Sequence, residues 1–163
     1  MRSLVWITFA TAALLGCAIA KSPSVKQVVI TAGIVDDHCG SMGHCMLLHI
    51  RNNSTQRLTI PVSESAKRWF AVEPLYQFEK LELEGTPVWK PTAQSIGTFL
   101  AAPNNASLGP GDTFDLWVPF PSLGPMNSKN VFRVVLLDVH SVAFLSSAFD
   151  AAGRAADEST PER

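Results

Sequence analysis

The stretch that decides the fold is Thr113-Phe114-Asp115-Leu116-Trp117-Val118-Pro119-Phe120. In an extended strand, successive side chains point to opposite faces of the sheet. The residues that would share one face are Phe114, Leu116, Val118 and Phe120, and those on the other are Thr113, Asp115 and Trp117. This alternation predicts a strand with one buried face. Residues 108–112, which contain two glycines and a proline, predict a turn just before it.

Short strands of similar kind are predicted along the rest of the chain. They cover residues 25–35, 45–51, 57–62, 76–84, 131–139 and 143–149. Residues 52–55 (Asn-Asn-Ser-Thr) predict a turn between the second and third of these. Residues 131–139 are apolar on both faces, which is typical of a central strand. Only residues 63–72 have apolar side chains at helical spacing, so we expect one or two helical turns there.

Short strands without long helices between them predict an all-β fold. We expect a single antiparallel β-sandwich of about seven or eight strands over residues 21–149. The hairpin around Asn52 and the turn and strand over residues 108–120 resemble those of immunoglobulin-like sandwiches in secreted bacterial proteins. This resemblance is architectural and implies no functional residues. Residues 150–163 are small, polar and charged, and we expect them to form a disordered tail.

Residues 1–20 have the three-part order of an export signal. Arg2 is followed by an uncharged apolar run over residues 4–16 and then by small residues. The run is shorter than the about 20 residues of a membrane-spanning helix. We therefore expect an exported protein, with the signal cleaved from the domain that follows.

Two processing sites are present at the end of this signal. Ala18-Ile19-Ala20 fits a small-residue cleavage site, which would free the domain at Lys21. Leu14-Leu15-Gly16-Cys17 resembles the lipobox of bacterial lipoproteins, which implies that Cys17 is lipidated and becomes the mature N-terminus. Several acyl chains give firm membrane anchoring. The resemblance predicts a periplasmic lipoprotein anchored to the outer membrane.

The composition is that of a globular domain without an electrostatic preference. Hydrophobic residues make up 47% of the chain and charged residues 17%. The 13 basic residues are balanced by 14 acidic ones and are not clustered, so nucleic acid is not an expected partner. Asp138 and His140, two apart on a predicted strand, lack a visible third catalytic member. We expect neither an enzyme nor a bound cofactor.

The densest group of reactive side chains lies in residues 36–49, with two cysteines, three histidines and two methionines. In an oxidising compartment Cys39 and Cys45 would form a disulfide. The alternative is a copper or zinc site, since soft sulfur ligands and imidazoles suit these metals. Its ligands would come from His38, Cys39, Met42, His44, Cys45, Met46 and His49. The two hypotheses exclude each other, because a ligating cysteine must be a thiolate.

Two tryptophans are the candidate contact residues for a partner. Trp117 lies on the solvent face of its predicted strand, and Trp89 stands between Pro87 and Pro91. Tryptophan is enriched where binding energy concentrates in protein interfaces. The sequence favours a non-catalytic binding module of the cell envelope that engages another envelope or secreted protein. The alternative is a metal-handling protein that uses the loop from His38 to His49.

Overall fold

The computed structural model describes residues 24–36, 39, 43–72, 75–83, 86–92, 104–119 and 130–157. Within them the chain is all-β, as predicted, apart from one short 3₁₀ turn, η1 (Val25–Gln27). The strands are β1 (Val28–Asp36), β2 (Cys45–Asn52), β3 (Leu58–Ser65), β4 (Arg68–Ala71), β5 (Tyr76–Glu82), β6 (Val88–Pro91), β7 (Asn104–Leu108), β8 (Thr113–Pro119), β9 (Val131–Leu137), β10 (Ala143–Leu145) and β11 (Phe149–Asp150). This set is larger than the expected number of about seven or eight strands. Short strands such as β6 and β7 carry no clear apolar alternation and were therefore not predicted. No helix in the described ranges has the length and hydrophobicity to cross a membrane.

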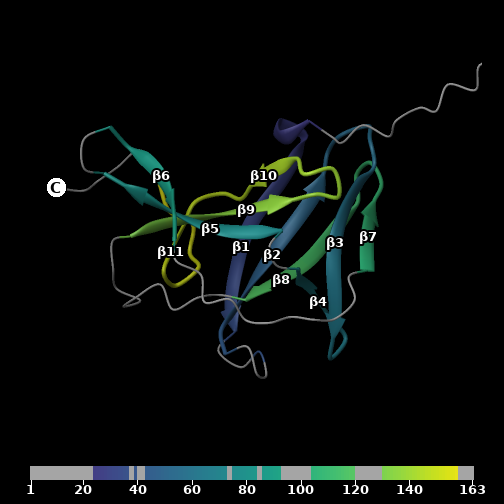
Figure 1. Cartoon of the computed structure of the whole chain (residues 1–163), viewed down its shortest axis with the longest axis horizontal. Coiled ribbons are helices and arrows are strands. Elements are labelled where there is room, and N and C mark those ends of the chain that lie inside the picture. Colours follow the sequence, from purple (N-terminus) through teal and green to yellow (C-terminus); the bar gives the residue numbers. More distant parts are fainter. Residues whose placement is uncertain are drawn as a thin grey trace, which may run out of the picture.

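The strands form two sheets that share one core (Figure 1). Sheet A has six strands in the order β1-β2-β8-β4-β3-β7. Sheet B has the order β10-β9-β5-β6, with β11 also paired to β9. The core joins buried side chains of both sheets, for example Leu48 of sheet A and Phe78 of sheet B. Two sheets that enclose one core in this way have the architecture of a β-sandwich.

Strand β8 confirms the predicted alternation. Leu116 and Val118 are fully buried, whereas Asp115 is exposed. On β2, Leu48 lies opposite Leu116 and Met46 lies opposite Val118, and both are buried as well. Directly opposed residues of neighbouring strands point to the same face of a sheet, so each pair adds two apolar side chains to the core.

The helical prediction for residues 63–72 is wrong. These residues form the end of β3, a tight turn and the whole of β4. The turn residues Ala66 and Lys67 have φ angles of 49° and 62°, the left-handed values that a two-residue hairpin turn requires. Successive side chains of β4 point to opposite faces, so Trp69 packs against the main core and Phe70 lies on the other face. Pairing with β3 and packing against β8 override the local helical spacing.

The expected boundary at residue 149 is too early. Residues 146–157, which we call the strap, are hydrogen-bonded to the rest of the fold and include β11. The N–H of Ser147 donates to the C=O of Ile30 at 2.8 Å, and Ser146 forms a parallel bridge with Ile30. Gly153 lies so close to β1 that a Cβ on it would be 2.9 Å from the carbonyl oxygen of Gly33. The strap therefore covers the outer edge of β1, and its sequence alone does not predict this contact.

Candidate binding site

Trp117 points away from the main core, as predicted, but it is half-buried. Phe70 and the Cys39–Cys45 disulfide form a small second cluster against which the indole packs. The guanidinium carbon of Arg68 lies 4.6 Å from the centroid of the ring. A cation over an indole face is attracted by the negative charge of the π-system. Much of the Trp117 surface is thus covered by its own chain.

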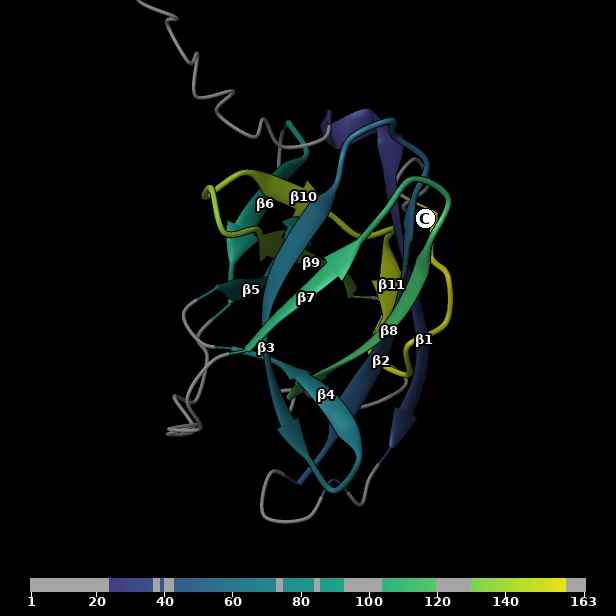
Figure 2. The same ribbon diagram turned by 90° about the vertical axis from the view of Figure 1, so that its right-hand side faces the viewer.

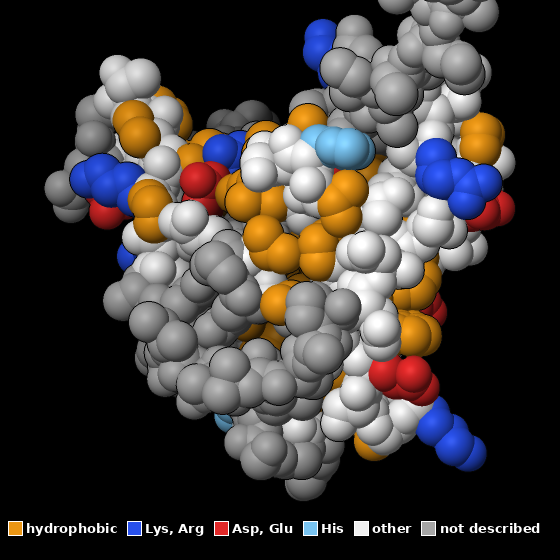
Figure 3. Space-filling model, turned by 45° about the vertical axis from the view of Figure 1, so that its right-hand side comes forward, with side chains coloured by type: hydrophobic (Ala, Val, Ile, Leu, Met, Phe, Trp, Pro, Cys, Tyr) orange, Lys and Arg blue, Asp and Glu red, His pale blue; other side chains and the backbone are white. Residues whose placement is uncertain are grey.

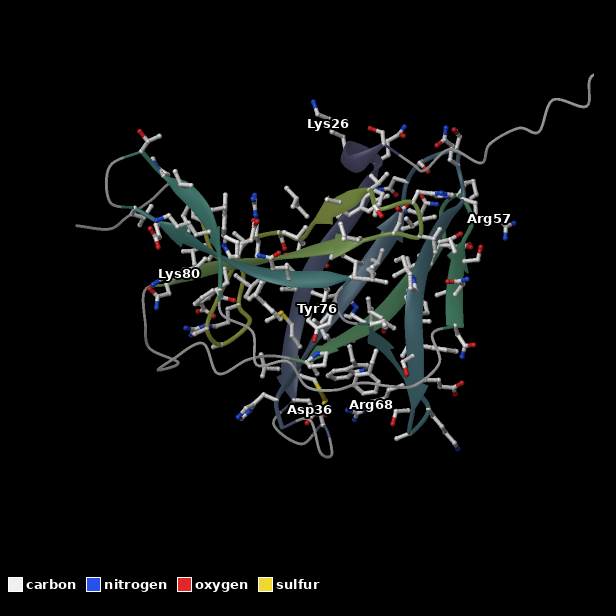
Figure 4. All side chains as sticks on the ribbon, in the orientation of Figure 1. Lys26, Asp36, Arg57, Arg68, Tyr76 and Lys80 are labelled. Carbon is white, nitrogen blue, oxygen red and sulfur yellow. A yellow bond between two sulfur atoms is a disulfide. The ribbon has the colours of Figure 1, made fainter. Side chains whose placement is uncertain are left out.

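The predicted disulfide is formed at this end of the molecule. The Cα atoms of Cys39 and Cys45 are 5.8 Å apart, within the usual range for a disulfide. Nη1 of Arg68 donates to Oδ2 of Asp36 at 2.7 Å and lies 3.8 Å from Sγ of Cys39. Figure 4 shows Asp36 and Arg68 side by side at this end. The cluster joins β4 to the end of β1, and its contacts are those of a structural support.

Trp89 is also half-covered. It lies on β6 with the guanidinium carbon of Arg133 4.3 Å from its ring centroid. Nε and Nη2 of Arg133 both donate to Oε2 of Glu79 at 2.7 Å. The ion pair holds the guanidinium in place, so one face of the indole packs against it. Neither of the two candidate tryptophans presents a fully free ring.

The alternative metal ligands are separated by the fold. The cysteines are joined in a disulfide, which offers no thiolate. On β2, Met46 is fully buried on the core face, whereas His49 points to the outer face. In the described part of the chain, no three His, Cys, Asp or Glu side chains are grouped to hold a metal ion. The candidate residues that lie outside the described residues are Cys17, His38 and Met42, together with Phe120 of the predicted strand.

His49 forms an exposed pair with Asp115 across β2 and β8. Its Nδ1 lies 2.7 Å from Oδ1 of Asp115. Gly33 makes room for the ring, because a Cβ there would be 2.9 Å from Nε2 of His49. The two side chains are 52% and 64% exposed. A polar pair with this exposure contributes little to stability, and the two side chains line a pocket that is open to solvent.

Asp138 and His140 do not form the strand pair that their spacing predicted. β9 ends at Leu137, and the buried Asp138 accepts hydrogen bonds at Oδ1 from the N–H groups of His140 and Val142. The carboxylate thus closes the turn before β10. Figure 3 shows hydrophobic side chains gathered in a patch beside a histidine on the face that it draws.

A groove opens between β7 and β8. The two strands leave a common turn and diverge, and β4 lies between their separated ends (Figure 2). The groove has a volume of about 510 Å³, within the usual range for ligand sites. Trp69 and Phe114 form its inner wall, with ring centroids 6.4 Å apart, and both pack against the core. Ala106 and Ser107 line one side and Thr113 lines the other.

The main chain of β7 that faces the groove has no strand partner in the described ranges. Ser107 lies opposite Thr59 of β3. The C=O of Thr59 accepts a hydrogen bond from the N–H of Val139, on the side away from β7, at 3.1 Å. In an antiparallel pair, opposed residues either bond each other or both face outward, in alternation. Asn105 and Ser107 therefore direct their N–H and C=O groups outward, toward the groove.

The same argument applies to β8 on the other side. The N–H of Asn52, on β2, donates to the C=O of Asp112 at 3.0 Å, and the C=O of Asn52 accepts a hydrogen bond from the N–H of Gly111 at 2.7 Å. Alternation from this point directs the main-chain groups of Thr113 and Asp115 away from β2. β4 pairs with β8 only further along, at Trp117. Within the part of the chain that the structure describes, these main-chain groups of β7 and β8 therefore have no strand partner.

The turn between β7 and β8, at one end of the groove, is held by the side chain of Asn52, which is fully buried. Its Nδ2 donates to the C=O of Gln56 at 2.8 Å and to that of Leu108 at 3.1 Å. Its Oδ1 accepts a hydrogen bond from Oγ of Ser54 at 2.7 Å. These bonds tie the turn after β2 to the turn after β7.

Sequence reasoning missed this groove and its aromatic residue Trp69. The available signals were the turn with two glycines and the uncharged residues Asn104–Leu108, for which the sequence predicts no strand. No family model, curated protein or solved structure matches this chain. The candidate site therefore depends on its geometry alone.

Proposed function

We propose that this chain is a non-catalytic binding module of the cell envelope that engages another protein through the groove between β7 and β8. The observation that carries the proposal is a groove with an aromatic inner wall, bordered by main-chain groups of β7 and β8 that have no strand partner among the described residues. Unpaired strand edges are templates for association with another chain. The partner is another envelope or secreted protein, and the balanced charge gives no electrostatic support for nucleic acid as a partner.

The proposal includes export and anchoring. Cleavage at the lipobox and lipidation of Cys17 would hold the module at the outer membrane, on the periplasmic side. The proposed resemblance to immunoglobulin-like domains concerns the sandwich architecture and not the strand order, since sheet A includes a parallel contact between β4 and β8. No observation in the described residues favours the metal-handling alternative, and we do not propose it.

A crosslinking experiment in cells tests this function. A photo-crosslinking amino acid is placed at Ser107 in the groove or at Ala143, an exposed residue of β10. We expect one discrete envelope protein to be crosslinked from Ser107 and not from Ala143. Equal products from both positions, or none from Ser107, would contradict the proposal. Fractionation of a Cys17→Ser variant, with a fatty-acid label, tests the anchor separately.

A further inference from the structure

We infer that the groove receives one extended segment of the partner, which pairs with the free edge of β7 as an added strand. This inference depends on the proposed binding function and specifies its mode. The segment is uncharged where it enters the groove and carries apolar side chains at alternate positions. In strand addition, main-chain hydrogen bonds supply affinity, and pockets for alternate side chains supply specificity.

The direction of the main-chain groups supports this mode. Asn105 and Ser107 present N–H and C=O groups on one side of the groove, and Thr113 and Asp115 present theirs on the other. An extended segment is the form of polypeptide that satisfies such groups in series. Its alternate side chains would point inward, where the rings of Trp69 and Phe114 are accessible. Apolar side chains at those positions would bury the rings from water.

The charge of the edge supports an uncharged segment. β7 contains no charged residue and no proline, whereas β6, at the edge of sheet B, contains Lys90 and Pro91. Lysine and proline on an edge strand discourage strand addition. The one acidic group in the groove, Asp112, already accepts the N–H of Gly109 at 2.7 Å. β7 itself thus lacks the lysine and proline of β6, and the cation beside it is Arg57, whose Nη1 donates to Oγ of Ser107 at 3.1 Å.

A second copy of this chain does not fit the groove in the same way. Its own β7 is hydrogen-bonded to β3, so it would bring a sheet into a space bordered by two strands of the first copy. A segment without lateral partners meets no such obstacle. Because β7 has five residues, the added strand that pairs with it is expected to be short.

The probe for the test is a phage-displayed library of random dodecapeptides, selected on the mature, oxidised protein. Selected peptides are then measured against the wild type, Ser107→Pro and the matched control Ser107→Ala. Proline removes the N–H that faces the groove, so we expect affinity to fall about tenfold, whereas Ser107→Ala stays within about twofold. N-methylation of alternate peptide amides should weaken binding to the wild type equally. The measurement with N-methylated peptides uses the wild-type protein, so it still tests strand addition if Ser107→Pro fails to fold.

Amide hydrogen exchange supplies an independent readout. Bound peptide should slow exchange at Asn105 and Ser107 and leave Lys90 of β6 unchanged. Failure to select any peptide, or peptides that are indifferent to both Ser107→Pro and N-methylation, would overturn strand addition. The crosslinking result from Ser107 in cells would still decide the proposed function, so the two failures are distinguishable.

Discussion

The two edge strands of sheet A, β1 and β7, differ in what lies along their outer sides. At one end, the strap covers β1 with the hydrogen bond from Ser147 to Ile30 and the close contact between Gly153 and Gly33. At the other end, β7 pairs with β3 on one side and faces an open groove on the other. An uncovered strand edge invites association, and proteins usually block it. Within the described residues, the chain thus covers one edge strand of the sheet and shows no strand partner along the outer side of the other.

Removing the anchor of the strap should have the largest effect. Phe149 is fully buried, with ring centroids 6.4 Å from Phe78 and 6.3 Å from Phe132. We expect Phe149→Ala to lower the free energy of unfolding by about 3–5 kcal/mol, the range for a core aromatic residue. Phe114→Ala at the half-buried groove wall should cost less. Denaturant titration of both variants measures the difference, and equal losses would mean that the groove wall is core.

A substitution in the strap should be more damaging than the same substitution at the groove. Gly153 and Gly111 have φ angles of 79° and 83°, but only at Gly153 would a Cβ meet another atom within 4 Å. Alanine at either position costs roughly 1–2 kcal/mol for the left-handed conformation. We expect Gly153→Ala to cost more and to speed amide exchange in β1, because the strap must move. If Gly111→Ala is as destabilising, the close contact with Gly33 is not what limits the strap.

Acid should loosen the sealed edge before the open one. Burial alone would raise the pKa of Asp150, but hydrogen bonds from the side chain and N–H of Arg154 and from the N–H of Ala152 outweigh it and lower this pKa. A carboxyl whose pKa is lower in the folded state stabilises that state above its unfolded pKa, and the contribution is lost as pH falls through the folded value. We therefore expect β1 amides near the strap to exchange faster at low pH. Asp150→Asn should abolish this dependence, and an unchanged profile in that variant would contradict it.

The smallest effect is expected at the open edge. Ser107→Lys adds a charge where the described residues place no strand partner, so the free energy of unfolding should change by no more than about 0.5 kcal/mol. The midpoint of a denaturant titration measures it. A loss of several times this size would show that the edge is paired within the fold. The same variant should reduce the Ser107-dependent peptide binding, because lysine protects an edge from strand addition.

Much of the strand content follows from local pattern. The alternation over residues 113–119 places Leu116 and Val118 in the core, and the predicted disulfide joins Cys39 to Cys45. The turn at Asn52 also lies where its residues indicated. Such predictions succeed because the face to which a side chain points depends on its place in the strand, and because two cysteines six positions apart are close in any compact loop.

The helix expected over residues 63–72 and the tail expected from residue 150 failed for a shared reason. Trp69 and Phe70 have the spacing of a helix, but their neighbours in β3 and β8 hold them in a strand. Most residues of the strap are small, yet hydrogen bonds to Ile30 of β1 and Val134 of β9 hold it against the fold. Local propensity is weak compared with tertiary contacts, and the sequence does not state which segments will meet.

By itself, the sequence determined that the chain forms strands, which faces of β2 and β8 are apolar, and that two cysteines can be joined. Tertiary structure alone decided which strand edges are covered. The strap that seals β1 and the groove beside β7 arise from pairing between segments far apart in the chain. An edge is free or blocked according to what lies next to it in space, and no periodicity within a strand carries that information.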